Sequence, residues 1–230
     1  MSEMLQPVIV DFPLDGEWFA PNTPGRRVPS HGTDMLGQRY AYDFMMIDWL
    51  DRKRPFRGSV WRHFLLGTPL PKWYGWGQNV YAPCDGLVLV VKDGVKERQR
   101  VHFLADLFVV LKNSLFYSPE KHGVHRIAGN YVIMKTKNEY AFFAHFQTGS
   151  ICVQAGQEMK AGELLGRVGH SGNSTAPHLH FQLADNADLL VAKGIPCAFR
   201  RYERFNDGAW EEVQGGVPSD KDRIRGRHRE

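Results

Sequence analysis

The segment from Ala176 to Leu183 reads APHLHFQL and places two histidines two residues apart. Gly and Pro punctuate the chain just before it and apolar residues follow it, so we expect a strand entered from a tight loop. Residues i and i+2 of a strand share one face, about 6.6 Å apart. His178 and His180 would then suit one metal ligand and one group acting on a metal-held water. On this motif alone, two histidines on a polar sheet face remain an alternative.

Other segments precede this motif in a fixed order: VYAPCDGLVLVVKDG, GNYVIMKTKNEYAFFAHF and VQAGQEMKAGELLGRVGHSG, followed by SGNSTAPHLHF. This series resembles the M23 family of zinc metallopeptidases, also described as lysostaphin-type or LytM-like. The match covers roughly Tyr40 to Leu183, apart from two insertions. Four blocks occur in the family's order, and the last agrees nearly letter for letter.

The resemblance implies a compact antiparallel β-sheet domain, sandwich-like or barrel-like, with a substrate groove and one zinc ion. It implies hydrolysis of peptide bonds, with peptidoglycan stem peptides or cross-bridges as the expected substrate. By the same resemblance, Asp43 and His180 match zinc ligands. His178 matches the histidine that acts on the attacking water, and His145 matches the histidine near the reacting carbonyl.

The chain departs from the family pattern at one ligand. The family has a histidine four residues before the aspartate, and Arg39 stands there in this chain. Arginine cannot be a ligand, because it stays protonated and offers no lone pair. The best replacement is His31 in PSHGTD, since Gly32 and Gly37 allow the intervening loop to fold back. Asp34 in the same loop is a weaker candidate. We therefore expect His31 to complete the zinc site.

The elements that must position these residues are mostly strands. Short β-branched or aromatic runs recur between Gly, Pro and Asn residues: PVIVDF, RYAYDFMMI, NVYAP, GLVLVVKDG, NYVIMKT, YAFFAHF, ELLGRVG and HLHFQLA. Long helical periodicity is absent, although Val95 to Leu111 has a composition that allows a helix. The pattern therefore predicts a mainly β fold, as an antiparallel sandwich or barrel.

We expect one peptidase-like domain over residues 1–215, with insertions at about 49–77 and 96–129. The first insertion carries four of the six tryptophans. Most of them should pack this insertion against the sheet, and at least one should face the groove. His170, in the glycine-rich turn RVGHSGN, is expected to be exposed. Residues 216–230 are basic and are expected to form a flexible tail.

Composition limits the function classes. The chain has 230 residues, 43% hydrophobic and 23% charged, which is typical of a globular protein. No apolar run approaches the length of a membrane span, so none is expected. The net charge of +4 lies mostly in the tail, and we expect no nucleic-acid partner. Three distant cysteines without a CxxC motif make a thiolate zinc site or a disulfide framework unexpected.

The chain as written begins without the basic and apolar regions of a secretory leader. It would be cytoplasmic as written, and periplasmic or extracellular if a leader was removed. Two other function classes stay open. One is a non-catalytic M23-like binding or regulatory module that has lost zinc catalysis, and the other is a phosphocarrier-type or lipoyl-like domain. Zinc content separates both from the peptidase.

Overall fold

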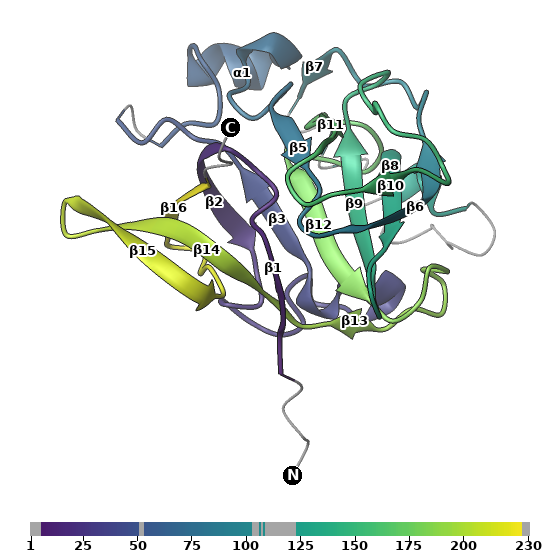
Figure 1. Cartoon of the computed structure of the whole chain (residues 1–230). Coiled ribbons are helices and arrows are strands. Elements are labelled where there is room, and N and C mark those ends of the chain that lie inside the picture. Colours follow the sequence, from purple (N-terminus) through teal and green to yellow (C-terminus); the bar gives the residue numbers. More distant parts are fainter. Residues whose placement is uncertain (1–5, 51–52, 103–105, 107, 109–122, 227–230) are drawn as a thin grey trace.

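The computed structural model describes residues 6–50, 53–102, 106, 108 and 123–226. Twelve of the described strands form one large sheet (Figure 1): β1 (Val8–Val10), β2 (Gly16–Asn22), β3 (Tyr42–Met45), β6 (Gly86–Lys92), β8 (Asn130–Lys135), β9 (Tyr140–Phe146), β10 (Glu158–Met159), β12 (Leu179–Ala184), β13 (Gly194–Ile195), β14 (Cys197–Asn206), β15 (Ala209–Gly216) and β16 (Arg223–Gly226). Two small sheets pair β5 (Asn79–Tyr81) with β11 (Leu164–Arg167), and β4 (Thr68–Pro69) with β7 (Arg100–Val101).

The helices are short. They are α1 (Val60–Leu66), α4 (His125–Ala128) and the 3₁₀ helices η1 (Met35–Tyr40) and η2 (Leu70–Lys72). None of the helices in the described part of the chain is long and apolar enough to cross a bilayer.

The strand order of the large sheet is β1-β14-β16-β2-β3-β12-β9-β8-β6-β10, with β13 on β12 and β15 on β14. This confirms the predicted mainly β class. The barrel-like form is not reached among the described strands, because the path runs openly from β1 to β10. The pairings between the described strands are antiparallel except that of β1 with β14, which is parallel. Figure 1 shows the β14–β15 hairpin projecting at one side of the sheet.

The two faces of the sheet differ at its centre: one face packs in the main core, and the other carries the candidate site residues. Successive side chains of a strand point to opposite faces. Phe44 on β3, Phe143 on β9 and Phe181 on β12 are fully buried in the main core. Asp43 and His180, which alternate with these residues, point to the other face. That face carries a second apolar cluster: Ala128, Ile133, Phe142, Ala144, Ala184, Leu189 and Ala192.

Strand β9 breaks this alternation at His145. Tyr131 lies opposite Ala144 and Asn130 lies opposite Phe146, so His145 is the extra residue of a β-bulge. Its φ of +67° lies in the left-handed region, which costs about 1–3 kcal/mol for a residue other than glycine. Simple alternation would put Ala144 and Phe146 on one face. Instead Phe146 packs in the main core, while Ala144 and His145 both face the second cluster.

The expectation of a flexible tail over 216–230 is wrong for the described part of that range. Strand β16 lies between β14 and β2 within the sheet, and Ile224 is fully buried in the main core. The large sheet therefore extends beyond the expected boundary at residue 215. Residues 227–230 lie outside the described residues.

The sequence of β16 explains why it forms a strand. Its first three residues, RIR, place Ile224 toward the core and the flanking arginines on the other face. Arg223 forms an ion pair of 2.6 Å with Glu17 on β2, and Arg225 forms one of 2.7 Å with Glu203 on β14. Opposite charges across neighbouring strands stabilise such pairings.

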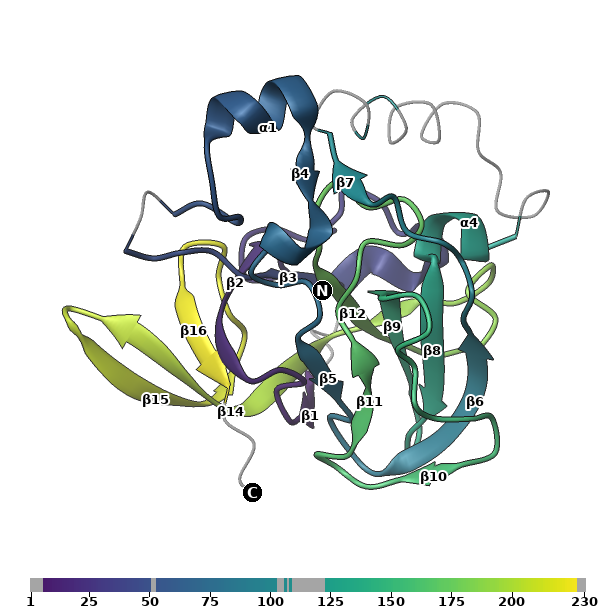
Figure 2. The ribbon, with the colours of Figure 1, turned by 90° about the horizontal axis from the view of Figure 1, so that it is seen from above.

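The first insertion packs around a small core in which Phe56, Leu70 and Trp73 join Val101 on β7 and Ala176 before β12. Trp76 packs against this core and Trp49 lies against Phe19, whereas Trp61 on α1 is 80% exposed. Figure 2 shows α1, β4 and β7 together, apart from the β14–β15 hairpin. The helix allowed over Val95 to Leu111 is replaced at Arg100–Val101 by β7, and most residues after 102 in that range lie outside the described residues.

We expect replacement of Trp73 by alanine to lower the free energy of unfolding by about 3–5 kcal/mol, because its ring is buried against Phe56 and Leu70. Trp61→Ala is the matched control and should change it by less than about 0.5 kcal/mol, since the side chain is exposed. Denaturant titrations of both variants measure the difference. Equal stability of the two variants would contradict a packing role for Trp73.

Candidate metal centre

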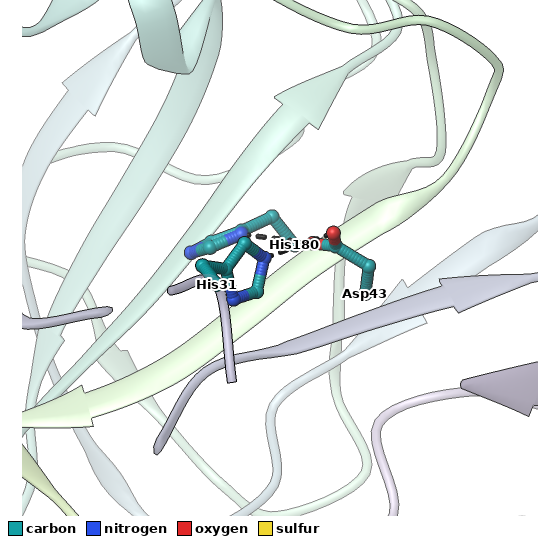
Figure 3. Close-up of side chains that lie close together, drawn as sticks. All are labelled: His31, Asp43 and His180. Atoms are coloured by element: carbon teal, nitrogen blue, oxygen red, sulfur yellow. Dashed lines mark hydrogen bonds and ion pairs between the residues drawn. The ribbon is translucent and has the colours of Figure 1, made fainter. Parts of the chain in front are cut away.

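Asp43 and His180 are brought together by strand pairing. They are direct partners across the antiparallel ladder between β3 and β12. Residues opposite each other on one face of such a ladder have neighbouring side chains. Accordingly, Nδ1 of His180 lies 2.9 Å from Oδ1 of Asp43. Figure 3 shows both side chains pointing toward one another, with His31 beside them.

His31 reaches this pair because its loop folds back before β3. The Ser30 amide donates a hydrogen bond of 3.0 Å to the carbonyl of Arg39, which closes the loop. Gly32 and Gly37 both have a φ of +72°, as the predicted freedom of this loop requires. At Gly37 an added Cβ would also lie 2.9 Å from a side-chain nitrogen of Gln182.

The structure brings His31 to the cluster and leaves the other candidate outside it. Nε2 of His31 lies 2.9 Å from Oδ2 of Asp43. Asp34, the weaker candidate, is instead held on the surface by Arg39, whose Nη1 donates to both carboxylate oxygens at 2.8 and 2.9 Å. Arg39, at the position of the family's missing ligand, therefore forms an ion pair at the surface of the loop.

Outer hydrogen bonds set which nitrogen of each ring faces the cluster. Nε2–H of His180 donates to Oε1 of Gln182 at 2.9 Å, and the amide of Gln182 is oriented by its own donation to the carbonyl of Leu36 at 2.8 Å. Nδ1 of His31 donates to the hydroxyl of Ser30, which donates onward to a carbonyl. With these outer nitrogens protonated, the nitrogen that each ring turns toward Asp43, Nδ1 of His180 and Nε2 of His31, donates a proton to the carboxylate or, once that proton is lost, is available to bind a metal.

The Asp43 carboxylate is held in its ionised form. Burial would raise the pKa of Asp43, but the neighbouring His31 and His178 charges and the hydrogen bonds from His180 and His31 hold it well below its usual value. Asn22 on β2 also donates to Oδ2 of Asp43 at 2.7 Å. An ionised carboxylate that accepts several hydrogen bonds is ready to act as a ligand.

These three residues fit a divalent metal. One ligand atom from each of His31, Asp43 and His180 lies within 4.8 Å of the others. Two imidazole nitrogens and one carboxylate form a donor set used by catalytic zinc sites, which keep a further position open. The outer partners that fix both rings are those expected around a metal ligand. The residues present therefore fit zinc.

The remaining two predicted residues lie beside this cluster. Nδ1–H of His145 donates to the carbonyl of Ser171 at 2.8 Å, and Nδ1–H of His178 donates to the carbonyl of Ala176 at 2.7 Å. Because a carbonyl only accepts, Nε2 of each neutral ring is free to accept a proton. The two ring centroids are 4.6 Å apart, and Nε2 of His178 is 3.6 Å from Oδ1 of Asp43.

Burial, and then the charges of His178 and His180, lower the pKa of His145 well below its usual value.

A carboxylate and four histidines line one cavity of about 260 Å³, and its wall includes apolar residues of the second cluster. Its lining is Asn22, His31, Leu36, Gln38, Asp43, Val124, Ile127, Ala128, Phe142, Ala144, His145, Asn173, Thr175, His178, His180, Gln182 and Leu189. None of the four tryptophans of the first insertion lines this cavity, contrary to the expectation for one of them.

The model of peptidase family M23 matches residues 117–190 of the chain. His145, His178 and His180 lie within the matched segment, and one relative aligns over 154 residues. Over this segment the chain is similar to peptidase family M23.

The chain is 33% identical over 154 residues to peptidoglycan DD-endopeptidase ShyB of Vibrio cholerae, and this match covers 63% of this chain and 27% of the relative. It is 32% identical over 80 residues to peptidoglycan DD-endopeptidase ShyA of the same organism, covering 31% of this chain and 18% of the relative. A solved structure described as a zinc-containing peptidase from Vibrio cholerae gives a TM-score of 0.39 at 20% identity, over 77% of this chain and 37% of that chain. The chain spans less than a third of the length of these curated relatives.

Two residues that contact the candidate metal ligands are missing from the sequence-based set. Gln182 follows His180 by two positions and so shares its face of β12, which is a signal that strand periodicity could have provided. Asn22 gives no such signal, because its contact with Asp43 depends on the pairing of β2 with β3.

We expect Gln182→Leu to weaken zinc binding by about 10–100-fold, because His180 loses the acceptor that fixes its tautomer. Competition titration with a zinc chelator of known affinity measures the change. Gln214→Leu, on exposed strand β15, is the matched control and should bind zinc as the parent does. Unchanged affinity in a folded Gln182→Leu protein would show that this hydrogen bond does not prepare the ligand.

Proposed function

We propose that this protein is a zinc-dependent endopeptidase that hydrolyses peptide bonds in the stem peptides or cross-bridges of peptidoglycan. The observation that carries the proposal is one cavity in which His31, Asp43 and His180 gather donor atoms beside His145 and His178. The curated relatives are named peptidoglycan DD-endopeptidases, and this supports peptidoglycan as the substrate.

Zinc held by His31, Asp43 and His180 would act as a Lewis acid toward the peptide carbonyl and the attacking water. Nε2 of His178 or His145 accepts a proton from that water as a general base. The other ring, once protonated, donates from Nε2 to the developing oxyanion or the leaving amine. The carbonyls behind both rings keep Nδ1 protonated throughout and hold each Nε2 toward the cavity.

The alternative is a non-catalytic M23-like module. Arg39 at the family's ligand position favours it, because a lost ligand is what such a module would show. The position of His31 supports the enzyme, since Nε2 of this residue points at Asp43 from the folded-back loop. The two functions differ in zinc content and in product formation.

Purified protein is to be assayed for zinc content and then incubated with isolated peptidoglycan. Mass spectrometry of the soluble fragments should show new amino and carboxyl ends at one type of peptide bond. Chelation should stop product formation and added zinc should restore it, while His180→Ala protein should form none. Absence of zinc would favour the binding module, and stoichiometric zinc without any cleaved bond would contradict the proposed reaction.

A further inference from the structure

The loop before β12 is held from behind by a buried line of side chains. His170, expected to be exposed, has no exposed surface at all. Its Nε2 lies 3.1 Å from Nη2 of Arg98, and its Nδ1 lies 3.0 Å from the hydroxyl of Ser174. That hydroxyl in turn lies 3.2 Å from Nδ1 of His178. The line thus runs from the start of the second insertion to a histidine of the candidate site.

The direction of each hydrogen bond in this line follows from Arg98. A guanidinium group only donates, so Nε2 of His170 must accept and Nδ1–H must donate to Ser174. Burial, followed by the charges of Arg98 and His178, lowers the pKa of His170 to about 3, which agrees with a neutral ring. The Ser174 hydroxyl then donates to the carbonyl of Ala176 at 2.6 Å.

The same two acceptors surround Nδ1 of His178. The carbonyl of Ala176 lies 2.7 Å from this nitrogen, and the oxygen of Ser174 lies 3.2 Å from it. The Ser174 hydroxyl donates its proton to the carbonyl of Ala176, so the Ser174 oxygen can only accept a hydrogen bond from His178. Both contacts therefore favour the tautomer with a proton on Nδ1 and a free Nε2.

Several further contacts hold Arg98 in the position from which it sets these donor and acceptor roles. It forms an ion pair of 2.7 Å with Asp106, whose side chain is 2% exposed. It also donates to the carbonyls of Gly172 at 3.1 Å and Ser174 at 2.5 Å. The preceding residue, Glu97, accepts from the amide of His170 at 2.6 Å, so two consecutive residues hold this loop.

We propose that Arg98 is a positioning residue, which acts through His170 and Ser174 to fix the tautomer and orientation of His178. The proposal rests on the proposed peptidase function for its kinetic consequence, but its structural consequence can be measured without substrate. It also assigns a purpose to the first residues of the second insertion.

The first experiment reads the tautomer directly. Long-range ¹H–¹⁵N spectra of histidine-labelled protein should show His178 as the Nδ1–H form in the parent. Arg98→Met should shift His170 and His178 toward mixed tautomers. Arg100→Met is the matched control: Arg100 donates to the carbonyls of Leu66 and Gly67, away from this line, and both histidines should keep their parental spectra.

The second experiment uses turnover of peptidoglycan fragments. Arg98→Met should lower kcat on the order of 10-fold with KM and zinc content unchanged, as for other outer-shell partners. Ser174→Ala should do the same, and Ser174→Thr should restore the parental value because it keeps the hydroxyl. This serine pair decides the question if the Arg98 variant does not fold.

Parental tautomers and kcat in folded Arg98→Met or Ser174→Ala protein would overturn the proposal. So would a loss of kcat that Ser174→Thr does not restore. A parent that cleaves no peptidoglycan would refute the proposed function instead, and the spectra would still decide whether Arg98 positions His178.

Discussion

Replacing Asp43 with alanine should leave a folded protein that retains no zinc and hydrolyses no peptidoglycan. Asp43 supplies the carboxylate of the described cluster and contacts both proposed histidine ligands, at 2.9 Å each. Loss of an outer partner alone costs about 10–100-fold in metal affinity, so loss of this ligand should cost more than about 100-fold. Zinc analysis, circular dichroism and the peptidoglycan assay measure the three expectations.

Asp43→Asn tests the same point with the shape of the side chain preserved. It removes the charge that two neighbouring histidines and Asn22 stabilise, and we expect it to lose zinc as well. Asp34→Ala is the control, because this aspartate lies in the preceding loop and is bound by Arg39 at the surface. Full zinc and full activity in Asp43→Ala would mean that the ligand assignment is wrong.

His178→Ala and His145→Ala should both keep zinc and lose turnover by about 10² or more, the usual contribution of a general acid or base. Neither ring belongs to the cluster of His31, Asp43 and His180, yet both turn Nε2 into the same cavity. Zinc analysis and kcat of each variant are the measurements. If His178→Ala loses zinc, the roles of His178 and His180 are exchanged.

The bulge adds an internal check on His145. His145→Gly and His145→Ala remove the same imidazole, so both should lose turnover. Only glycine adopts a φ of +67° without strain, and His145→Gly should therefore be more stable than His145→Ala by about 1 kcal/mol. Denaturant titrations of the pair test this. Equal stability would show that the left-handed backbone at this position is not strained.

Strand alternation was sufficient to predict part of this site. The spacing of His178 and His180 puts these two side chains on one face before any coordinates are known, whereas Asp43 was expected only from the resemblance to M23 peptidases. Two glycines around a turn allowed His31 to reach them, and the structure shows both with positive φ. Local rules sufficed because strand pairing places each of these residues where its own segment predicts.

The same rule fails where a distant segment decides the conformation. Alternation puts His145 on the core side, and the bulge opposite Asn130 and Tyr131 reverses this. His170 looked exposed in a glycine-rich turn, yet Arg98, 72 positions earlier, covers it. The strand in the basic tail was not predicted, because Ile224 is its only apolar side chain. Ile224 becomes part of the core only through strand partners that lie far away in the chain.

The placement of β16 has a consequence for the order in which the molecule can be completed. Glu17 on β2 and Arg223 on β16 are 206 positions apart, and the sheet joins them directly. At a synthesis rate of about 5–20 residues per second, roughly 10–40 seconds separate the emergence of these two strands. During that interval β2 has an uncovered edge toward its later neighbour, and uncovered strand edges are templates for pairing between chains. In the nascent protein, this edge of β2 therefore stays open to pairing with other chains until the last described strand is made.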